Sequence, residues 1–295
     1  MGLYHNYRRI IMKISVSSYS FGGYLNPDNL GILGCMDWAK EQGFEGIEIT
    51  DGDLVRSGVD IHEVAEHSKK IGLPIVAFLF GKDFLAKQGT QVEEEIETAK
   101  AMIDKAAILG APLVRHDITG CDLGKKHGIG LDSVIDTLAY ACRKVTEYAA
   151  ERGIKTSFEN HGHFMQEAAL CEKMINAVDH DNFGYTLDMG NFLCADEDPG
   201  YAVGKLARYA FHVHAKDFHI KQGGVDFPGE GWFKTRGNNY LRGAIIGHGD
   251  ANVARSIGAL KMHGYNGWVS VEFEGMEDNL KGIRLGKANL ERYIG

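Results

Sequence analysis

Four short segments of the sequence each end in side chains that can bind a metal ion or carry a proton. They are Lys155–His161, Tyr185–Asp188, His212–Asp217 and Trp268–Glu272. Alternating β-branched, aromatic and small residues of this length are typical of β-strands. In a parallel barrel the carboxyl ends of all strands lie at one face, so side chains at those ends can meet. The spacing therefore predicts a site built from four strand ends.

The predicted metal site takes one side chain from each segment: Glu159, Asp188, His214 and Glu272. Three carboxylates and one imidazole suit Mn²⁺ best, with Mg²⁺, Co²⁺ or Zn²⁺ as alternatives. A divalent ion would offset two of the three negative charges, which otherwise repel one another. Glu274 and His212 are rival ligands, because each lies two residues from a predicted ligand and shares its face of the strand.

The rest of the chain alternates between strand and helix patterns, which must position these segments. We expect strands at 13–20, 44–50, 74–80, 112–117, 155–161, 183–189, 210–216 and 268–274. We expect helices at 29–42, 61–71, 93–109, 131–152, 166–178, 196–209, 250–263 and 278–293. Several helices stop at a glycine that leads directly into the next strand, as in short connections of α/β proteins.

Strict alternation predicts an α/β fold with a parallel sheet, and eight units favour a closed (β/α)8 TIM barrel. An open doubly wound sheet is the alternative. It is disfavoured because no GxGxxG motif follows the first strand and because an open sheet would spread the four ligands along its length. We therefore expect residues 13–295 to form a single barrel domain, preceded by an extension at 1–12.

The segment 217–249 is too long for an ordinary connection in a compact domain. It is rich in glycine and also carries Trp232, Phe233 and Tyr240, which argue against disorder. Long loops in compact domains are often functional. Because this segment follows the seventh strand, we expect a lid-like loop on the catalytic face.

Composition limits the classes of partner. The chain has 295 residues, 44% hydrophobic, and a formal net charge of -8, which argues against binding of nucleic acid or an anionic membrane surface. No apolar run reaches the roughly 18 residues of a membrane span, and the N-terminus lacks the apolar core of a secretory signal. Five scattered cysteines without CxxC spacing indicate reduced thiols, so we expect a cytoplasmic protein.

Four motifs resemble one known family: SFEN at 157–160, YTLDMGN at 185–191, HVHAKD at 212–217 and GWVSVEFEG at 267–275. They resemble the sugar phosphate isomerase/epimerase superfamily with the xylose isomerase-like barrel, and the resemblance covers nearly the whole chain. It implies a divalent metal at the four predicted ligands and a small-molecule carbohydrate substrate. It also implies a role in carbohydrate metabolism, and pairing into homo-oligomers.

The resemblance extends to mechanism. Glu159 and Glu272 resemble the acid–base pair of the ketose 3-epimerases, one taking a proton and the other returning it through a metal-stabilised enediolate. The expected activity is therefore isomerisation or epimerisation of a keto sugar or sugar derivative. If a β-hydroxyl leaves instead, the reaction becomes a dehydration, as in the inosose dehydratase branch, or elimination from a keto-glycoside.

Polar and aromatic side chains near the predicted strand ends could bind the substrate. Only one of Arg115 and His116 can face the barrel interior, and we expect it to be His116. The full set of predicted substrate contacts is His116, Asn160, His161, Asn191, Lys216, Asp217, Arg242 and Trp268.

Two other functions fit the sequence less well. Endonuclease IV resembles the same barrel family, but it would need further histidines and a basic surface, and Asn191 stands where that branch carries a histidine. A non-catalytic accessory subunit would not need both Glu159 and Glu272.

Overall fold

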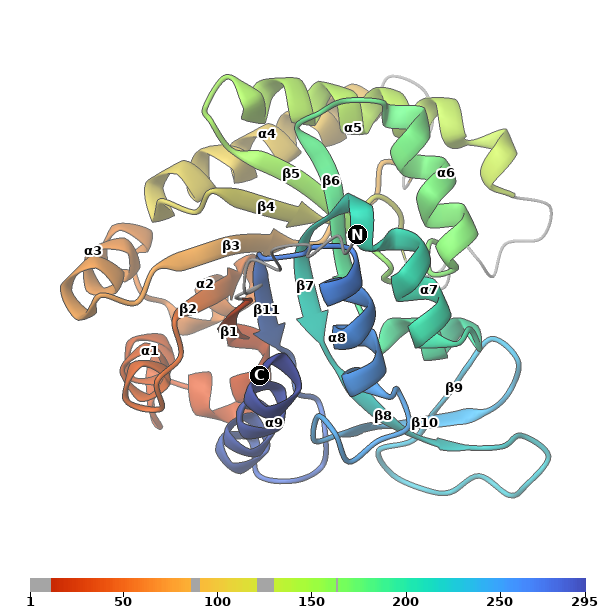
Figure 1. Ribbon diagram of the computed structural model, residues 1–295. Coiled ribbons are helices and arrows are strands. Elements are labelled where there is room, and N and C mark those ends of the chain that lie inside the picture. Colours follow the sequence, from red (N-terminus) through yellow and green to blue (C-terminus); the bar gives the residue numbers. More distant parts are fainter. Residues whose placement is uncertain (1–11, 86–90, 121–129, 163) are drawn as a thin grey trace, which may run out of the picture.

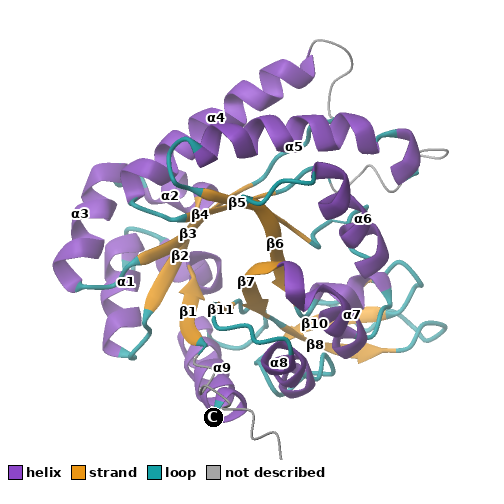
Figure 2. Ribbon diagram, turned by 45° about the horizontal axis from the view of Figure 1, so that its top comes forward, coloured by secondary structure: helices purple, strands orange, loops and turns teal. Residues whose placement is uncertain are grey.

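The computed structural model describes residues 12–295 apart from 86–90, 121–129 and 163. Among these residues, eight parallel strands close into a barrel in the order β1-β11-β7-β6-β5-β4-β3-β2. Helices surround the strands (Figures 1 and 2). The predicted (β/α)8 barrel is confirmed. Its strands are β1 (Lys13–Ser17), β2 (Gly46–Thr50), β3 (Ile75–Phe80), β4 (Leu113–His116), β5 (Lys155–Glu159), β6 (Phe183–Asp188), β7 (Ala210–Ala215) and β11 (Trp268–Val271).

The outer helices follow the predicted pattern closely, and α3 has the predicted bounds. They are α1 (Gly31–Glu41), α2 (Asp51–Ser57), α3 (Ile61–Ile71), α4 (Gln91–Leu109), α5 (Ile135–Ala150), α6 (Ala168–Val178), α7 (Pro199–Leu206), α8 (Val253–Met262) and α9 (Asn279–Ile294). Short 3-10 helices cover Ser18–Leu25, Leu131–Ser133, Asn191–Ala195 and Ala207–Tyr209. The glycines after α3 and α4, Gly72 and Gly110, have φ of 63° and 72°. This left-handed conformation costs other residues roughly 1–2 kcal/mol, which explains the helix–Gly–strand pattern.

Most of the apolar core lies between the strands and the helices. Phe78, Phe158, Tyr185 and Leu187 are fully buried within it. Each such side chain contributes about 1.5–3 kcal/mol when it leaves water. Since this layer supplies the hydrophobic stabilisation, the interior face of the barrel can carry polar residues without loss of the fold.

The barrel interior contains buried hydroxyl pairs beneath the strand ends. Ser157 Oγ lies 2.7 Å from Thr186 Oγ1, and Ser15 Oγ lies 2.6 Å from Ser270 Oγ. Parallel pairing places Ser157 beside Gly184 and His214 beside both Asp188 and Ser270. The hydroxyls satisfy one another, so small polar residues can occupy the layer below a charged one.

The predicted lid-like loop at 217–249 contains regular structure, which is a correction. It forms a three-stranded antiparallel sheet in the order β8-β10-β9, with β8 (Asp217–Lys221), β9 (Phe233–Lys234) and β10 (Tyr240–Ala244). Figures 1 and 2 place this sheet beside α7 and α8. Its glycines lie mainly in the turns, where Gly224, Gly229 and Gly231 have positive φ. The high glycine content concealed the short strands between those turns.

Other differences are local. The first strand ends at Ser17, where a 3-10 helix begins, and α2 was not predicted. The proposed extension lies outside the described residues except for Met12, which is buried in the core. Four cysteines are buried as free thiols, and Cys121 lies outside the described residues. Within the described part of the chain, no helix combines the length and apolarity that crossing a bilayer requires.

Candidate metal centre

Four side chains from neighbouring strands meet at the carboxyl end of the barrel. Glu159 and Asp188 are the last residues of β5 and β6, His214 lies in β7, and Glu272 directly follows β11. One ligand atom from each residue lies within 4.8 Å of those of the others. His214 Nδ1 is 3.5 Å from Glu159 Oε1, 3.9 Å from Asp188 Oδ2 and 3.7 Å from Glu272 Oε2. The four predicted ligands therefore form one compact group.

Burial and hydrogen bonding of this group fit a bound cation. All four residues are buried, with exposed fractions of at most 4%. One polar atom of each makes no hydrogen bond of regular geometry: Glu159 Oε2, Asp188 Oδ2, His214 Nδ1 and Glu272 Oε2. Three of these atoms instead have a charged side chain nearby, Arg115 for Glu159 Oε2 and Lys216 for Asp188 Oδ2 and Glu272 Oε2. Unpartnered buried polar atoms are rare in folded proteins. Three carboxylates and one imidazole that each bring a ligand atom to the same small volume have the donor set of an oxygen-rich divalent metal site.

The surrounding charges also match a divalent ion. Among the described residues, the buried carboxylates of Glu159, Asp188, Glu272 and Glu48 lie close to two permanent cations, Arg115 and Lys216. Arg115 also pairs with Asp117, so negative charge exceeds positive charge in this group. Burial, together with the like charges of Glu272 and Glu159, raises the pKa of Asp188 to about 8. A divalent cation would remove that repulsion and favour the ionised carboxylate.

Glu159 is held by neighbours on both of its oxygens. Arg115 Nε lies 2.7 Å from Oε2, and the Asn191 side-chain amide donates to Oε1 over 3.0 Å. Burial favours the protonated form, but the positive charge of Arg115 outweighs it and holds the pKa of Glu159 well below its usual range. Glu159 is therefore held in a fixed orientation, as a candidate ligand should be.

Lys216 lies among the carboxylates on the opposite side. Its ammonium is 2.6 Å from Glu272 Oε2, 3.3 Å from Asp188 Oδ2 and 3.7 Å from Glu274 Oε2. Burial opposes its charge, yet the carboxylates raise the pKa of Lys216 well above its usual range. Lys216 therefore supplies a positive charge next to Glu272, and Glu274 lies at the edge of the group rather than within it.

A cavity of about 210 Å³ is lined by Asn191 and Lys216, which contact Glu159 and Glu272 of the candidate ligand group. Three of the predicted substrate contacts, His161, Asn191 and Lys216, line it together with Glu274. Phe218 and Phe233 form an apolar wall, with ring centroids 5.6 Å apart. The antiparallel sheet therefore supplies one wall of the cavity. Polar groups with an aromatic wall suit a molecule with hydroxyls on one side and C–H groups on the other.

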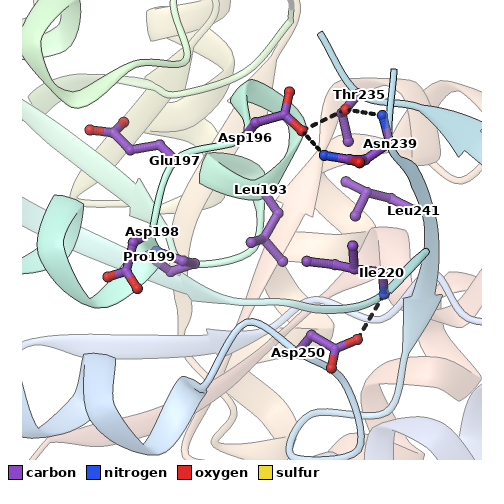
Figure 3. Close-up of a pocket in the computed structure, with 10 residues that line it drawn as sticks. All are labelled: Leu193, Asp196, Glu197, Asp198, Pro199, Ile220, Thr235, Asn239, Leu241 and Asp250. Atoms are coloured by element: carbon purple, nitrogen blue, oxygen red, sulfur yellow. Dashed lines mark hydrogen bonds between the residues drawn. The ribbon is translucent and has the colours of Figure 1, made fainter. Parts of the chain in front are cut away.

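A second cavity of about 250 Å³ lies next to the same sheet and carries several carboxylates (Figure 3). Asp196 accepts hydrogen bonds from Thr235 Oγ1 and Asn239 Nδ2, each over 2.7 Å, and Asp250 accepts from the backbone of Ile220. These partners anchor the antiparallel sheet to the barrel. This cavity is thus a structural junction.

The structure places Arg115 rather than His116 beside the ligands, so this expectation was wrong. The His116 ring packs in the outer core against Phe80, Phe84 and Phe183. The strand has only four residues, and its last side chain points outward in phase with Val114. Alternation alone does not say which member of a neighbouring pair faces inward.

Because His116 is buried and uncharged, we expect it to make the protein acid-sensitive. Burial lowers the pKa of His116 to about 4, against an opposing hydrogen bond to the carbonyl of Asp117. Between pH 6.5 and 4 the unfolded chain takes up a proton that the folded protein does not, so stability is lost as pH falls through this window. The free energy of unfolding can be measured by chemical denaturation at pH 7 and at pH 4.5. Its decrease between these pH values should be smaller by about 2 kcal/mol in His116→Phe than in the unsubstituted protein. Equal losses in the two proteins would contradict this assignment.

Four further predicted substrate contacts have structural partners. Asn160 donates to the carbonyl of Asp188 and accepts from its amide, which links β5 to β6. Asp217 accepts backbone N–H groups of Phe218, Gly247, Gly249 and Ala251, and so organises the chain after β10. Arg242 lies over the Trp232 ring at 5.4 Å. Trp268 begins β11 at the opposite end of the strand from Glu272, with Lys13 over its ring.

These positions correct the predictions for Asn160, Asp217 and Trp268. A polar residue after a strand often satisfies the backbone of the connection that follows. Trp268 was misplaced because a residue that opens a parallel strand lies at the amino-terminal rim of the barrel, away from the site. Conversely, sequence reasoning missed Glu48 and Tyr19. Tyr19 follows β1, and its hydroxyl donates to Glu274 over 3.2 Å.

Comparison with known proteins identifies the family of this chain. A family model described as xylose isomerase-like TIM barrel matches residues 36–293. The chain belongs to this family. The expectation from the four sequence motifs is thus confirmed at the level of family and fold.

The curated relatives have several different activities. The chain is 25% identical over 236 residues to a 3-dehydroshikimate dehydratase of Pseudomonas aeruginosa, with 77% of this chain and 35% of that protein covered. It thus spans about a third of that relative's length. An inosose dehydratase of Bacillus cereus is 25% identical, with 70% of this chain and 65% of the relative covered. An inosose isomerase of Halalkalibacterium halodurans is 23% identical, with 83% of each covered.

Solved structures with the same fold include an L-ribulose 3-epimerase, with a TM-score of 0.74 and 19% identity over 96% of this chain and 95% of that one. The IOLI protein with a bound zinc atom has a TM-score of 0.76 and 18% identity, with 96% and 98% covered. A barrel protein from Mycobacterium smegmatis in complex with magnesium has a TM-score of 0.71 and 17% identity, with 96% of each chain covered. At these identities the likeness shows the fold.

Proposed function

We propose that the chain is a metal-dependent isomerase or epimerase of a keto sugar or a related keto-polyol. The observation that carries the proposal is the buried candidate ligand group. In it, Glu159 at the end of β5 and Glu272 directly after β11 lie together near a cavity with polar and aromatic walls. Mn²⁺ is the proposed ion, with Mg²⁺, Co²⁺ or Zn²⁺ as alternatives. A cytoplasmic location and association into a homo-oligomer remain predictions from the sequence.

The proposed reaction is a proton transfer at the carbon next to the carbonyl. When bound, the ion would stabilise the negative charge that develops on the substrate oxygens as this proton leaves. Glu272 would take the proton. The ammonium of Lys216, which lies next to it, favours the ionised carboxylate that a base requires. Glu159, fixed by Arg115, would face the substrate from β5. It would take up a proton from solvent and pass it to the carbon, while Glu272 releases its proton to solvent to complete the cycle.

A dehydration is the second candidate, and Lys216 favours it. An ammonium group 2.6 Å from Glu272 could protonate a departing β-hydroxyl while the glutamate removes the C–H proton, so that water leaves and a C=C bond forms. The names of the dehydratase relatives point in the same direction. The substrate would then be an inosose or another β-hydroxy ketone; from a keto-glycoside the same elimination would release the aglycone alcohol instead of water.

One experiment separates the two reactions. The Mn²⁺-loaded protein is incubated in D₂O with a panel of ketohexoses, ketopentoses and an inosose, and the products are analysed by mass spectrometry and NMR. Isomerisation or epimerisation yields a product with the same atoms as the substrate, except that a carbon-bound hydrogen is replaced by deuterium from solvent. Dehydration yields a product that lacks one water. Absence of both changes with every compound, for a protein shown to bind the metal, would contradict the proposed function.

A further inference from the structure

Glu48 is a fully buried carboxylate that lies below the four ligands in the barrel interior. It occupies the middle of β2, between Ile47 and Ile49, whose side chains lie in the apolar core. Glu48 Oε2 is 2.7 Å from His212 Nε2, 3.2 Å from His214 Nε2 and 3.0 Å from Ser270 Oγ, which donates to it. Its surroundings are therefore hydrogen-bond donors from β7 and β11.

A buried carboxylate at this depth needs a physical reason. Removing an unpaired carboxylate from water costs several kcal/mol, so such a group is rarely kept unless its partners require it. Two imidazole nitrogens, from His212 and His214, and the Ser270 hydroxyl all lie within hydrogen-bond distance of Glu48 Oε2. A carboxylate oxygen surrounded in this way accepts hydrogen bonds, so each imidazole presents an N–H to it.

This requirement determines how His214 faces the ligand group. With its proton on Nε2, directed at Glu48, the ring leaves Nδ1 as a lone pair that points at Glu159, Asp188 and Glu272. The other neutral tautomer would direct a proton at the three carboxylates and could not bind a cation. Hydrogen bonds to the far nitrogen of a metal-binding histidine commonly set its tautomer and ring orientation.

His212 holds the carboxylate from a second direction. Its ring lies perpendicular to that of His214, at 88° with centroids 5.4 Å apart, and its Nε2 makes the shortest contact with Glu48. Together with the Ser270 hydroxyl, this contact fixes Glu48 independently of His214. His212 was a rival metal ligand in the sequence, but its distance to Glu48 is that of a direct hydrogen bond.

We propose that Glu48 is a positioning residue that fixes His214 as a metal ligand, with His212 and Ser270 as its supports. The inference rests on the proposed metal site and deepens it, since it assigns a role to a buried acidic residue outside the ligand group. The competing explanation is a second cation bound among Glu48, His212 and His214, whose ligand atoms also lie within 4.8 Å of one another.

The test compares metal affinity in matched variants. Mn²⁺ is titrated calorimetrically into metal-free protein, into Glu48→Gln and into the control Ser157→Ala, after circular dichroism has shown that each is folded. Glu48→Gln removes the negative charge and turns one of the two acceptor oxygens into an NH₂ donor, so we expect the dissociation constant to rise by roughly 10–100-fold. Ser157→Ala removes a buried interior hydrogen bond that does not touch His214, and its dissociation constant should stay within about threefold.

A spectroscopic readout needs no substituted protein. In the Zn²⁺-loaded, ¹⁵N-labelled protein, NMR should show His214 protonated at Nε2 and without a proton at Nδ1.

A second variant, Glu48→Asp, keeps the charge but retracts it by one methylene, so it should also weaken metal binding. It replaces Glu48→Gln if that variant does not fold.

The outcomes are distinct. Weaker binding by the Glu48 variants, with one ion per chain in the unsubstituted protein, supports the positioning role. Unchanged affinity in Glu48→Gln, a proton on Nδ1 of His214, or two ions per chain with one lost in Glu48→Gln would overturn it. If the unsubstituted protein binds no divalent ion, the proposed function fails together with this inference.

Discussion

Glu272→Gln is expected to lower turnover of the cognate keto substrate by at least about 10³-fold while the protein stays folded. The amide cannot take a proton, and it replaces a charged oxygen in the ligand group. It also leaves the buried ammonium of Lys216 without its nearest carboxylate. Steady-state kinetics of the Mn²⁺-loaded variant, with the metal content measured in parallel, give the result.

Glu274→Gln is the matched control. It makes the same chemical change two residues further on, at a carboxylate that lies 3.7 Å from Lys216 but outside the ligand group. Turnover in this variant should stay within about tenfold of that of the unsubstituted protein, since it loses only a peripheral charge. Glu159→Gln should resemble Glu272→Gln. A metal-loaded Glu272→Gln or Glu159→Gln protein that keeps more than a tenth of the activity would refute the paired-glutamate scheme.

Removal of the divalent ion is expected to have an effect of similar size. Dialysis against a chelator should reduce turnover to the background level, and addition of Mn²⁺ should restore it, because Lys216 and Arg115 already pair with carboxylates and the ion would hold the negative charge that develops on the substrate. The metal-free protein should also unfold more easily. At a free metal concentration 100 times the dissociation constant, the bound state gains about 2.7 kcal/mol.

Thermal denaturation of the protein with and without Mn²⁺ measures this gain. His214→Ala serves as the reference, because it lacks one of the four ligands and should show little change on addition of the ion. A metal-free protein with full activity, or equal stabilisation of His214→Ala and the unsubstituted protein, would contradict the assignment.

The barrel could be predicted because its signals are local. Glycines such as Gly72 and Gly110 end helices in a conformation that other residues avoid, and each leads into a buried strand. The grouping of the four candidate ligands could be predicted for a related reason. Carboxyl ends of parallel strands converge, so Glu159 and Asp188 had to meet at one rim once the strands were correctly assigned.

The remaining errors concern which side of a strand a residue faces, how far along the strand it lies, and which hydrogen bonds it makes. The sequence pattern alone does not show these features. Arg115 and His116 are neighbours, and only the register with β5 shows which one faces Glu159. Glu48 lies in mid-strand rather than at a strand end, so a search for terminal ligands passed over it. Its signal was a carboxylate at an inward position of an otherwise apolar strand. For Asp217, only the structure reveals the four backbone N–H groups that it accepts.

Elemental analysis by mass spectrometry tests the central claim most directly. The protein, purified without chelator and then equilibrated with Mn²⁺, should retain one divalent ion per chain after gel filtration. Asp188→Asn, which removes one charge from the ligand group, should retain far less. A protein that retains no divalent ion under these conditions, or an Asp188→Asn variant that retains as much as the unsubstituted protein, would contradict the account.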